Sequence, residues 1–324
     1  MSDYNVIAGL KIKYLSSDPS NPENGQVWYN STTSKLRAGG ILGTGAWSSG
    51  GNLNTGRVGN AGFGTQTAAV SAGGYSGTSS VEEYNGSSWT AVTSLPSGID
   101  SAGSCGTQTQ GLIFGGQTPG GPNVNTTLKY DGTNWTSVGT LNTTRRDLIG
   151  AGTQTSALAA LGAIDPPFTT ATEEYNGSSW TSVNSANGPA RRSAAGGGTQ
   201  TSALAFGGYG PTYTAATESY NGSTWTNVTS LPSARGVLGG GGTSNSDALA
   251  YGGYTGSYLA TTNSWNGSSW AAENNLAVAR GTKFGLPSGP TGAQLYAGGN
   301  PNPAGYAATE EFTVPVGTAN ITSS

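Results

Sequence analysis

The sequence predicts an all-β protein built from one repeated unit, and three observations lead to this prediction. Each unit contains short apolar runs bounded by Gly, Asn, Ser and Pro, which is typical of strands. No segment has a sustained helical periodicity. Six tryptophans recur 42 to 46 residues apart, at Trp47, Trp89, Trp135, Trp180, Trp225 and Trp270. This spacing suits one four-stranded blade of a β-propeller for each unit.

Each unit divides at its glycines into four expected strands. The first is a run of small residues after an arginine, as in 193–198, and the second is an apolar phrase that ends in Gly-Gly, as in 202–208. The third reads Thr-Glu-Glu-Tyr in 172–175, and the fourth carries the tryptophan. Asn-Gly or Asp-Gly joins the third to the fourth, and these residues tolerate the positive φ of a tight turn. We therefore expect antiparallel pairing here, with the Tyr packed near the Trp.

The number of blades follows from the second strands. Six of them end in glycine, at Gly74, Gly116, Gly162, Gly208, Gly253 and Gly299. The last unit has a third strand at 309–314 without a Trp strand after it, whereas the first Trp strand, 46–49, has no strands before it. We expect these N- and C-terminal strands to pair and close a six-bladed ring, which removes exposed sheet edges. A seven-bladed ring, with a blade from residues 5–40, is the alternative.

The expected domains are an N-terminal extension at 1–45, a β-propeller at 46–314 and a C-terminal tail at 315–324. Within 46–314, a glycine pair that ends an apolar strand, followed by Tyr, Trp and Arg, resembles the kelch motif of galactose-oxidase-type propellers. The resemblance implies a propeller that serves as a binding module or as an oxidase. The segment from Leu15 to Leu36 is similar to a phrase in virion proteins of tailed bacteriophages. That resemblance implies a tail, fibre or capsid protein on the virion surface.

Several classes of function are disfavoured by composition. The chain has no histidine and one cysteine, Cys105, which we expect to be a buried small residue. Copper-oxidase and zinc sites therefore lack their ligands, and we expect no metal, no cofactor and no catalytic residue. A net charge of −3 disfavours nucleic-acid binding. The chain starts without a signal-peptide pattern and has no bilayer-spanning segment, so we expect synthesis in the host cytoplasm without membrane insertion.

Paired glutamates such as Glu82 and Glu83 suggest the carboxylates of a glycosidase. Adjacent residues of a strand point to opposite faces, however, so each pair is held apart. The pairs also recur at the same place in several units, which favours a structural role. A carboxylate-based glycan hydrolase remains the less favoured alternative.

Loops that vary in length and content are expected on one face of the propeller, between the second and third strands and between successive units. Varied aromatic loops on a rigid repeat are where binding specificity usually lies. The alternatives are that the aromatic side chains pack between blades and that the in-register arginines, such as Arg57 and Arg145, pair with the repeat's glutamates. The predicted ligand-binding residues are Tyr75, Arg146, Phe168, Arg192, Tyr209, Tyr213, Tyr254, Tyr258 and Tyr306.

The N-terminal extension is the second candidate interface. Pro19 and Pro22 predict an extended linker, and 26–30 with 35–38 predict a hairpin around 31–34. We expect Pro19, Pro22, Trp28 and Tyr29 to attach the propeller to other virion proteins, or else the extension to cover the edge of the closing blade. The predicted function is a non-enzymatic phage virion protein, monomeric or homo-oligomeric, that binds a host surface glycan or protein. The alternative is a purely structural decoration or connector protein.

Overall fold

The computed structural model describes residues 4–7, 10–19, 22, 25–41, 43–75, 78–282, 284–301 and 306–320. Every regular element among them is a strand, which confirms the all-β prediction. The contacts divide the chain into two compact units, Met1–Ala46 with Thr313–Ser324, and Trp47–Phe312. No helix in the described part of the chain has the length and apolar character of a membrane span.

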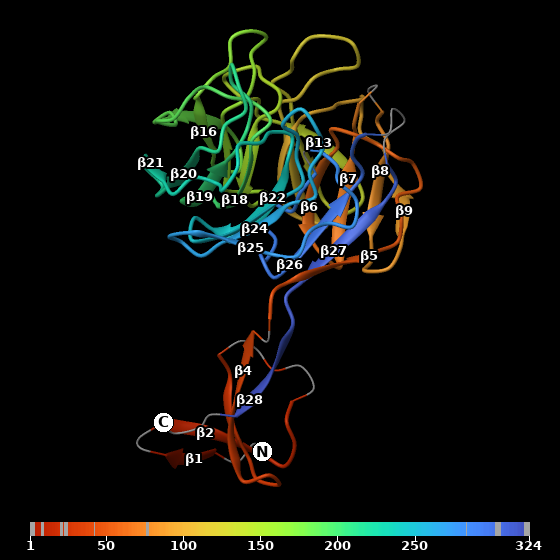
Figure 1. Cartoon of the computed structure of the whole chain (residues 1–324). Coiled ribbons are helices and arrows are strands. Elements are labelled where there is room, and N and C mark those ends of the chain that lie inside the picture. Colours follow the sequence, from red (N-terminus) through yellow and green to blue (C-terminus); the bar gives the residue numbers. More distant parts are fainter. Residues whose placement is uncertain are drawn as a thin grey trace. The chain divides into compact units, whose positions relative to one another are not determined.

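Six sheets make up the larger unit (Figure 1). Five of them contain four consecutive antiparallel strands: β6 (Ala61–Thr65), β7 (Ala68–Ala72), β8 (Val81–Tyr84) and β9 (Trp89–Val92); β10 (Gly103–Thr107), β11 (Gln110–Phe114), β12 (Thr127–Tyr130) and β13 (Trp135–Val138); β14 (Ile149–Gly152), β15 (Ala157–Ala160), β16 (Thr172–Tyr175) and β17 (Trp180–Val183); β18 (Ala195–Thr199), β19 (Ser202–Phe206), β20 (Thr217–Tyr220) and β21 (Trp225–Val228); β22 (Gly239–Ser244), β23 (Asp247–Tyr251), β24 (Thr262–Trp265) and β25 (Trp270–Ala272). The sixth has the order β26 (Ala293–Ala297), β27 (Thr309–Thr313) and β5 (Ala46–Ser49), so strands from distant parts of the chain share one sheet.

A seventh sheet forms the smaller unit. Its strands are β1 (Tyr4–Ile7), β2 (Leu10–Leu15), β3 (Val27–Asn30), β4 (Lys35–Ile41) and β28 (Val316–Asn320), in this order. The hairpin predicted around 31–34 is confirmed, because Asn30 lies opposite Lys35. The described residues of the expected C-terminal tail are not a separate segment, since β28 pairs with β4. The described residues thus form one sheet more than the six expected, and strands β1 to β4 of this sheet come from the region, 5–40, that was considered for an alternative seventh blade.

Each predicted Asn-Gly or Asp-Gly turn closes a hairpin between the third and fourth strands of a sheet. In the first hairpin the Oδ1 of Asn85 accepts hydrogen bonds from the backbone of Ser87 and Ser88, at 3.0 and 2.9 Å. Tyr84 and Trp89 then lie directly opposite each other, with ring centroids 4.9 Å apart. The equivalent ring pairs of the other four hairpins have centroids 4.5 to 5.3 Å apart. The turn chemistry therefore fixes the register that pairs the rings.

Neighbouring sheets are joined by a recurring set of hydrogen bonds. The indole Nε1 of Trp180 donates to the Oγ1 of Thr127 in the preceding sheet, at 2.9 Å. The hydroxyl of Tyr220 donates to Glu174 of the preceding sheet at 2.8 Å, and the Nε2 of Gln200 donates to the carbonyl of Tyr175 at 2.7 Å. Gln200 belongs to a Gly-Thr-Gln-Thr turn between first and second strands, which recurs at 64–67, 106–109, 152–155 and 198–201. These turns, and the second glutamate of a pair such as Glu174, thus hold adjacent sheets together.

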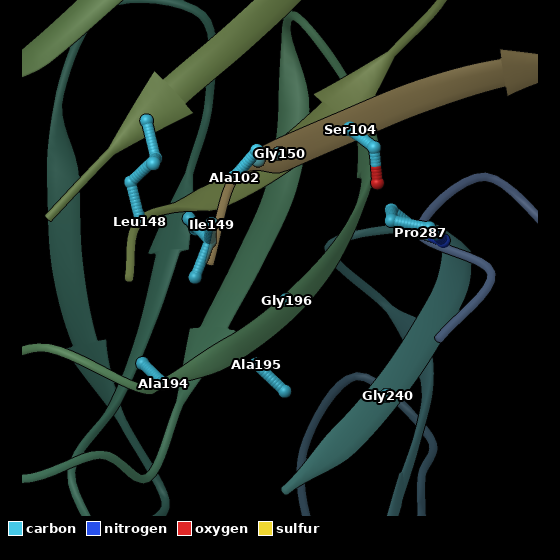
Figure 2. Close-up of a pocket in the computed structure, with 11 residues that line it drawn as sticks. Ala102, Ser104, Leu148, Ile149, Gly150, Ala194, Ala195, Gly196, Gly240 and Pro287 are labelled. Carbon is cyan, nitrogen blue, oxygen red and sulfur yellow. The ribbon is translucent and has the colours of Figure 1, made fainter. Parts of the chain in front are cut away.

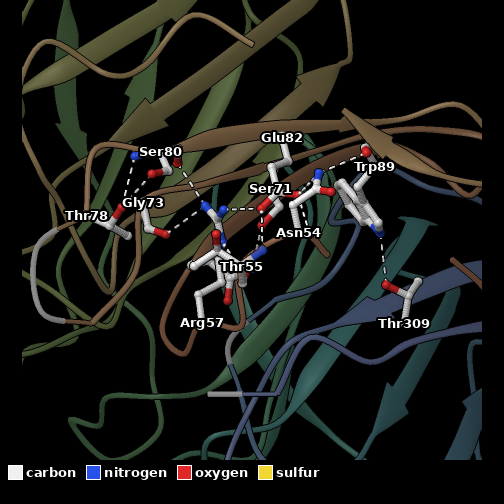
Figure 3. A network of polar contacts seen from close by, with 11 residues as sticks. Asn54, Thr55, Arg57, Ser71, Gly73, Thr78, Ser80, Glu82, Trp89 and Thr309 are labelled. Carbon is white, nitrogen blue, oxygen red and sulfur yellow. Dashed lines mark hydrogen bonds and ion pairs between the residues drawn. The ribbon is translucent and has the colours of Figure 1, made fainter. Parts of the chain in front are cut away.

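One buried arginine occupies the same place in five of the six sheets. Figure 3 shows the first, in which the Arg57 guanidinium pairs with Glu82 and donates to the carbonyls of Gly73 and Ser80. Equivalent ion pairs join Arg145 to Glu173, Arg191 to Glu218 and Arg280 to Glu310. This confirms that the in-register arginines are intramolecular partners of the glutamates. In the fifth sheet Arg235 donates instead to the amide oxygen of Asn263, at 2.9 Å.

The second sheet has replaced the ion pair by an apolar pair. Ile99 stands four residues before β10, where Arg57 stands before β6, and Leu128 stands where Glu82 does. Both side chains are buried in one hydrophobic cluster. The fold therefore accepts either a charged or an apolar pair at this place.

Candidate functional site

The loop face is the end of the sheets that carries the connections between second and third strands and between successive sheets. In an antiparallel meander these connections share one end, and the hairpin turns share the other, which we call the turn face. On the loop face, the residue after four of the five buried arginines forms a bridge with the loop that follows the second strand. Such bridges join Arg146 to Ala163, Arg192 to Tyr209 and Gly236 to Tyr254. The repeat therefore presents one variable position per sheet in a fixed geometry.

The chemistry at this repeated position divides the loop face into two regions. Its occupants are Val58, Asp100, Arg146, Arg192, Gly236 and Gly281 in chain order. Three successive sheets thus present a charged side chain, and the next two present glycine. A Cβ added at Gly236 or Gly281 would come within 3.3 Å of the ring of Tyr213 or Tyr258, so each glycine leaves room for a tyrosine.

The charged positions line a hollow of about 380 Å³, which we call the polar hollow. Its walls are Tyr75, Asp100, Ser101, Gln117, Gly120, Arg146, Asp147 and Arg192. A second hollow of about 200 Å³ shares Tyr75, Asp100, Ser101, Asp147 and Arg192, and adds Val58, Gly59, Ser193 and Val237. The volume of the polar hollow is within the range of small-molecule sites.

Opposite charges face each other across the polar hollow. The Oδ2 of Asp147 lies 3.4 Å from the Nη1 of Arg192 and 3.7 Å from the Nε of Arg146. Arg146 also pairs with Asp165, at 2.7 Å, and donates to the Oδ1 of Asn123. The Nε of Arg192 is buried without a hydrogen-bond partner in the described structure. The hollow therefore offers carboxylate acceptors and guanidinium donors side by side, close to electrical neutrality.

The floor of this region is built from residues in the left-handed backbone conformation. Ser101, Asp147, Ser193 and Val237 have φ values between 53° and 57°. Each lies two residues after the buried arginine or its replacement, and each donates a backbone hydrogen bond to the equivalent residue of the preceding sheet, at 2.7 to 3.0 Å. This conformation is uncommon for residues other than glycine and costs free energy, above all for the β-branched Val237. The chain thus accepts strain to fix the floor.

Below the floor, small residues fill the middle of the propeller. Figure 2 shows Gly150, Gly196 and Gly240 with Ala195 and Pro287 around a cavity of about 30 Å³. Such a volume holds one water molecule. Residues 284–289 pack against this region, where Gly198 donates to the carbonyl of Pro287 and Ser288 donates to the carbonyl of Gly152, so the space beneath the polar hollow is filled by protein.

The other half of the loop face carries a row of half-buried rings, which we call the aromatic arc. It consists of Phe168, Tyr209, Tyr213, Tyr254 and Tyr258, whose successive ring centroids are 4.9 to 6.0 Å apart. The guanidinium of Arg192 lies 5.8 Å from the ring centroids of both Phe168 and Tyr209. Burial raises the pKa of Tyr213 and of Tyr258. Arg192 therefore belongs to the polar hollow and also begins the aromatic arc.

Eight of the nine predicted ligand-binding residues fall into these two groups. Tyr75, Arg146 and Arg192 line the polar hollow, and the five residues of the aromatic arc were all predicted. Their packing against one another is also in line with the alternative that the rings contact neighbouring loops. Tyr306 is half-buried on the sixth sheet and belongs to neither group. Sequence reasoning missed Asp100, Ser101 and Asp147, although alignment of the loops on the buried arginine would have placed them beside Arg146 and Arg192.

The expected attachment segment is partly a core. The ring of Trp28 is fully buried and its Nε1 donates to the Oδ1 of Asp18, at 2.9 Å. Arg37 also pairs with Asp18, and the hydrogen bonds from Arg37, Asn30 and Trp28 hold the pKa of that carboxyl well below its usual range. Trp28 is therefore not an exposed contact residue, which corrects its predicted placement. Pro22 is also buried, while Pro19 and Tyr29 are half-buried.

Neither a metal centre nor a reactive thiol is apparent in the described residues. No three of their His, Cys, Asp and Glu side chains gather where they could hold a metal ion. Cys105 is fully buried, and burial raises the pKa of its thiol well above the usual range. The expectation of a buried small residue at this position is confirmed.

The comparisons with known proteins support the fold. The chain is similar to the solved structure of YjhT, with a TM-score of 0.68 and 15% sequence identity, over 83% of this chain and 99% of that one. No protein-family model and no curated protein matches the sequence. The likeness supports a β-propeller and, at this identity, carries the fold alone.

Proposed function

We propose that the chain is a non-enzymatic virion protein of a tailed bacteriophage, whose closed six-bladed propeller binds a glycan of the host surface through its loop face. The observation that carries the proposal is the joining of the polar hollow and the aromatic arc at Arg192. Glycan sites combine aromatic rings, which pack on the C–H faces of sugars, with planar polar groups that pair with hydroxyls. Both kinds of group lie here on one rigid face.

The closed ring is supported by a hydrogen bond from the indole Nε1 of each fourth-strand tryptophan to a threonine of the preceding unit. Four tryptophans donate to the hydroxyl of a third-strand threonine: Trp47 to Thr262, Trp89 to Thr309, Trp180 to Thr127 and Trp225 to Thr172. The other two donate to a backbone carbonyl just after the fourth strand: Trp135 to Thr93 and Trp270 to Thr229. The Trp89 contact joins the first sheet to the sixth. A ring with a seventh blade would require the strands of residues 4–41, which belong to the other compact unit.

The absence of enzymatic activity is supported by the state of the carboxylates. Asp147 forms ion pairs with the guanidinium groups of both Arg146 and Arg192, so its carboxylate is held by contacts within the protein. The glutamate pairs are committed to arginines and tyrosines inside and between sheets. The virion assignment is supported by the resemblance of residues 15–36 to phage virion proteins, and by a separate unit that could attach the propeller to other virion proteins.

Binding of the purified chain to intact host bacteria and to a glycan array tests the proposal. We expect saturable binding that is lost in the triple variant Tyr209→Ala, Tyr213→Ala, Tyr254→Ala, with melting curves showing that both proteins are folded. The matched control is Asp247→Asn on the turn face, where the side chain accepts a hydrogen bond from Thr243. Absence of binding by the folded wild-type chain would contradict the proposal and favour a purely structural role in the virion.

A further inference from the structure

The polar hollow is suited to an uncharged sugar. Its two guanidiniums face two carboxylates, and Arg146 is further neutralised by Asp165. An acidic sugar would bring its carboxylate close to Asp100 and Asp147, where repulsion opposes binding. A neutral sugar offers hydroxyls, which donate to carboxylates and accept from guanidinium groups. The guanidinium of Arg192, which lines the hollow and lies 3.4 Å from the carboxylate of Asp147, can donate to such a hydroxyl.

One wall of the hollow provides an apolar surface. Tyr75 is 72% exposed, the highest exposure among the large hydrophobic residues of the described chain. A tyrosine in this position loses little conformational entropy when a sugar ring packs on it. The hollow thus has hydrogen-bonding groups on one side and an aromatic ring on the other.

The hollow is closed below and continues sideways. Beneath it, residues 284–289 pack against the first strands of other sheets: Gly198 donates to the carbonyl of Pro287, Ser288 donates to the carbonyl of Gly152, and a Cβ on Gly62 would meet the ring of Phe284. This packing leaves no route for a glycan chain beneath the hollow. The continuous route out runs over Arg192 to Phe168 and Tyr209, and along the aromatic arc to Tyr258. A ligand that occupies both regions therefore ends in the hollow. Surface glycans are attached to cells through their reducing ends, so the end that is accessible is the non-reducing one.

We propose that the polar hollow holds the uncharged, non-reducing terminal sugar of a glycan whose following sugars lie along the aromatic arc. This inference rests on the proposed function. It adds that the terminal sugar is uncharged, that it is the non-reducing end of the glycan, and that the glycan runs from the polar hollow along the aromatic arc. It assigns two separable roles. Asp147 and Arg192 select the terminal sugar, and Tyr254 contributes only when the chain is long enough to reach it.

The test uses tetrasaccharides immobilised through their reducing ends, with hexose, deoxyhexose or N-acetylhexosamine at the other end, each with and without a sialic acid cap. The corresponding methyl glycosides serve as single-sugar probes. We expect at least one uncapped tetrasaccharide to bind, and its cap to weaken binding tenfold or more. Asp147→Asn should weaken the methyl glycoside and the tetrasaccharide alike, tenfold or more, whereas Tyr254→Ala should weaken the tetrasaccharide alone.

Because asparagine adopts the left-handed conformation that residue 147 has, Asp147→Asn should leave the backbone of the floor unchanged. If its melting curve shows a loss of folding, Asp100→Asn is used in place of Asp147→Asn. Asp247→Asn is the control that should change neither affinity. Two results would overturn the inference but leave the proposed function intact. The first is equal binding of capped and uncapped glycans. The second is that Asp147→Asn binds glycan as the wild type does, while the triple variant of Tyr209, Tyr213 and Tyr254 has lost glycan binding. If no glycan binds the folded chain, both fail.

Discussion

The ion pair between Arg191 and Glu218 provides a quantitative test of how the blades are stabilised. Both side chains are fully buried, and the Nη1 of Arg191 lies 2.7 Å from the Oε2 of Glu218. In Glu218→Leu, the guanidinium keeps its hydrogen bonds to the carbonyls of Gly207 and Pro189, so the charge stays buried without its counter-ion. Removing one partner of a buried pair costs about 3–5 kcal/mol. We expect the free energy of unfolding to fall by about that amount.

The double variant Arg191→Ile, Glu218→Leu copies the apolar pair Ile99 and Leu128 of the second sheet. It loses three hydrogen bonds, to Gly207 and Pro189 and from the backbone of Gly188, at about 1 kcal/mol each. The removal of a buried ion pair in favour of apolar packing returns about 1–4 kcal/mol. We therefore expect a net change between a gain of about 1 kcal/mol and a loss of about 2 kcal/mol, measured by urea unfolding with tryptophan fluorescence. A double variant no more stable than Glu218→Leu would refute the reasoning.

Three further outcomes follow from the same repeat. Asn263→Asp should raise the free energy of unfolding by about 1–2 kcal/mol, because it gives the buried Arg235 a counter-ion in place of an amide oxygen 2.9 Å away; unchanged or lower stability in urea would count against this. Tyr220→Phe should lower the free energy of unfolding by about 1–3 kcal/mol, because the hydroxyl of Tyr220 donates to Glu174. Tyr175→Phe should change it by less than about 0.5 kcal/mol, because the buried hydroxyl of Tyr175 has no hydrogen-bond partner in the described structure. Equal losses would contradict this difference between the two hydroxyls. Burial, and then the hydrogen bond to Glu311, raise the pKa of Tyr84 to about 12. The stability that the neutral phenol contributes is therefore complete below pH 10 and is lost between pH 10 and 12. If the free energy of unfolding in urea falls as steeply over this range in Tyr84→Phe as in the wild type, that contribution is excluded.

Much of the propeller could be predicted from the sequence because its determinants are local. Asn85 and Gly86 fix a hairpin turn within four residues, and a two-residue period then brings Tyr84 opposite Trp89. The pairing of arginines with glutamates was also within reach, because both recur once per unit. The role of the glutamine in the Gly-Thr-Gln-Thr turns could not be predicted, since nothing in its local pattern shows that Gln154 reaches the carbonyls of the preceding sheet.

The candidate site was predicted only in part because it depends on contacts between units. Asp100, Arg146 and Arg192 come from three successive connections, and the left-handed residues that follow them bring these side chains into one hollow. A backbone conformation of this kind in Asp147 or Val237 has no signal in residue type. Trp28 was misplaced for a similar reason, because its burial depends on Asp18, a linker residue ten positions earlier.

The central claim is that the loop face is the binding surface, and a hydrogen-exchange footprint tests it most directly. Backbone exchange of the full chain would be measured with and without the best-binding tetrasaccharide of the panel. We predict protection of the loops at 117–123, 163–168, 209–213 and 254–258, with unchanged exchange in the Gly-Thr-Gln-Thr turns around Gln108, Gln154 and Gln200 on the turn face. Protection of those turns, with the loops unchanged, would contradict the account.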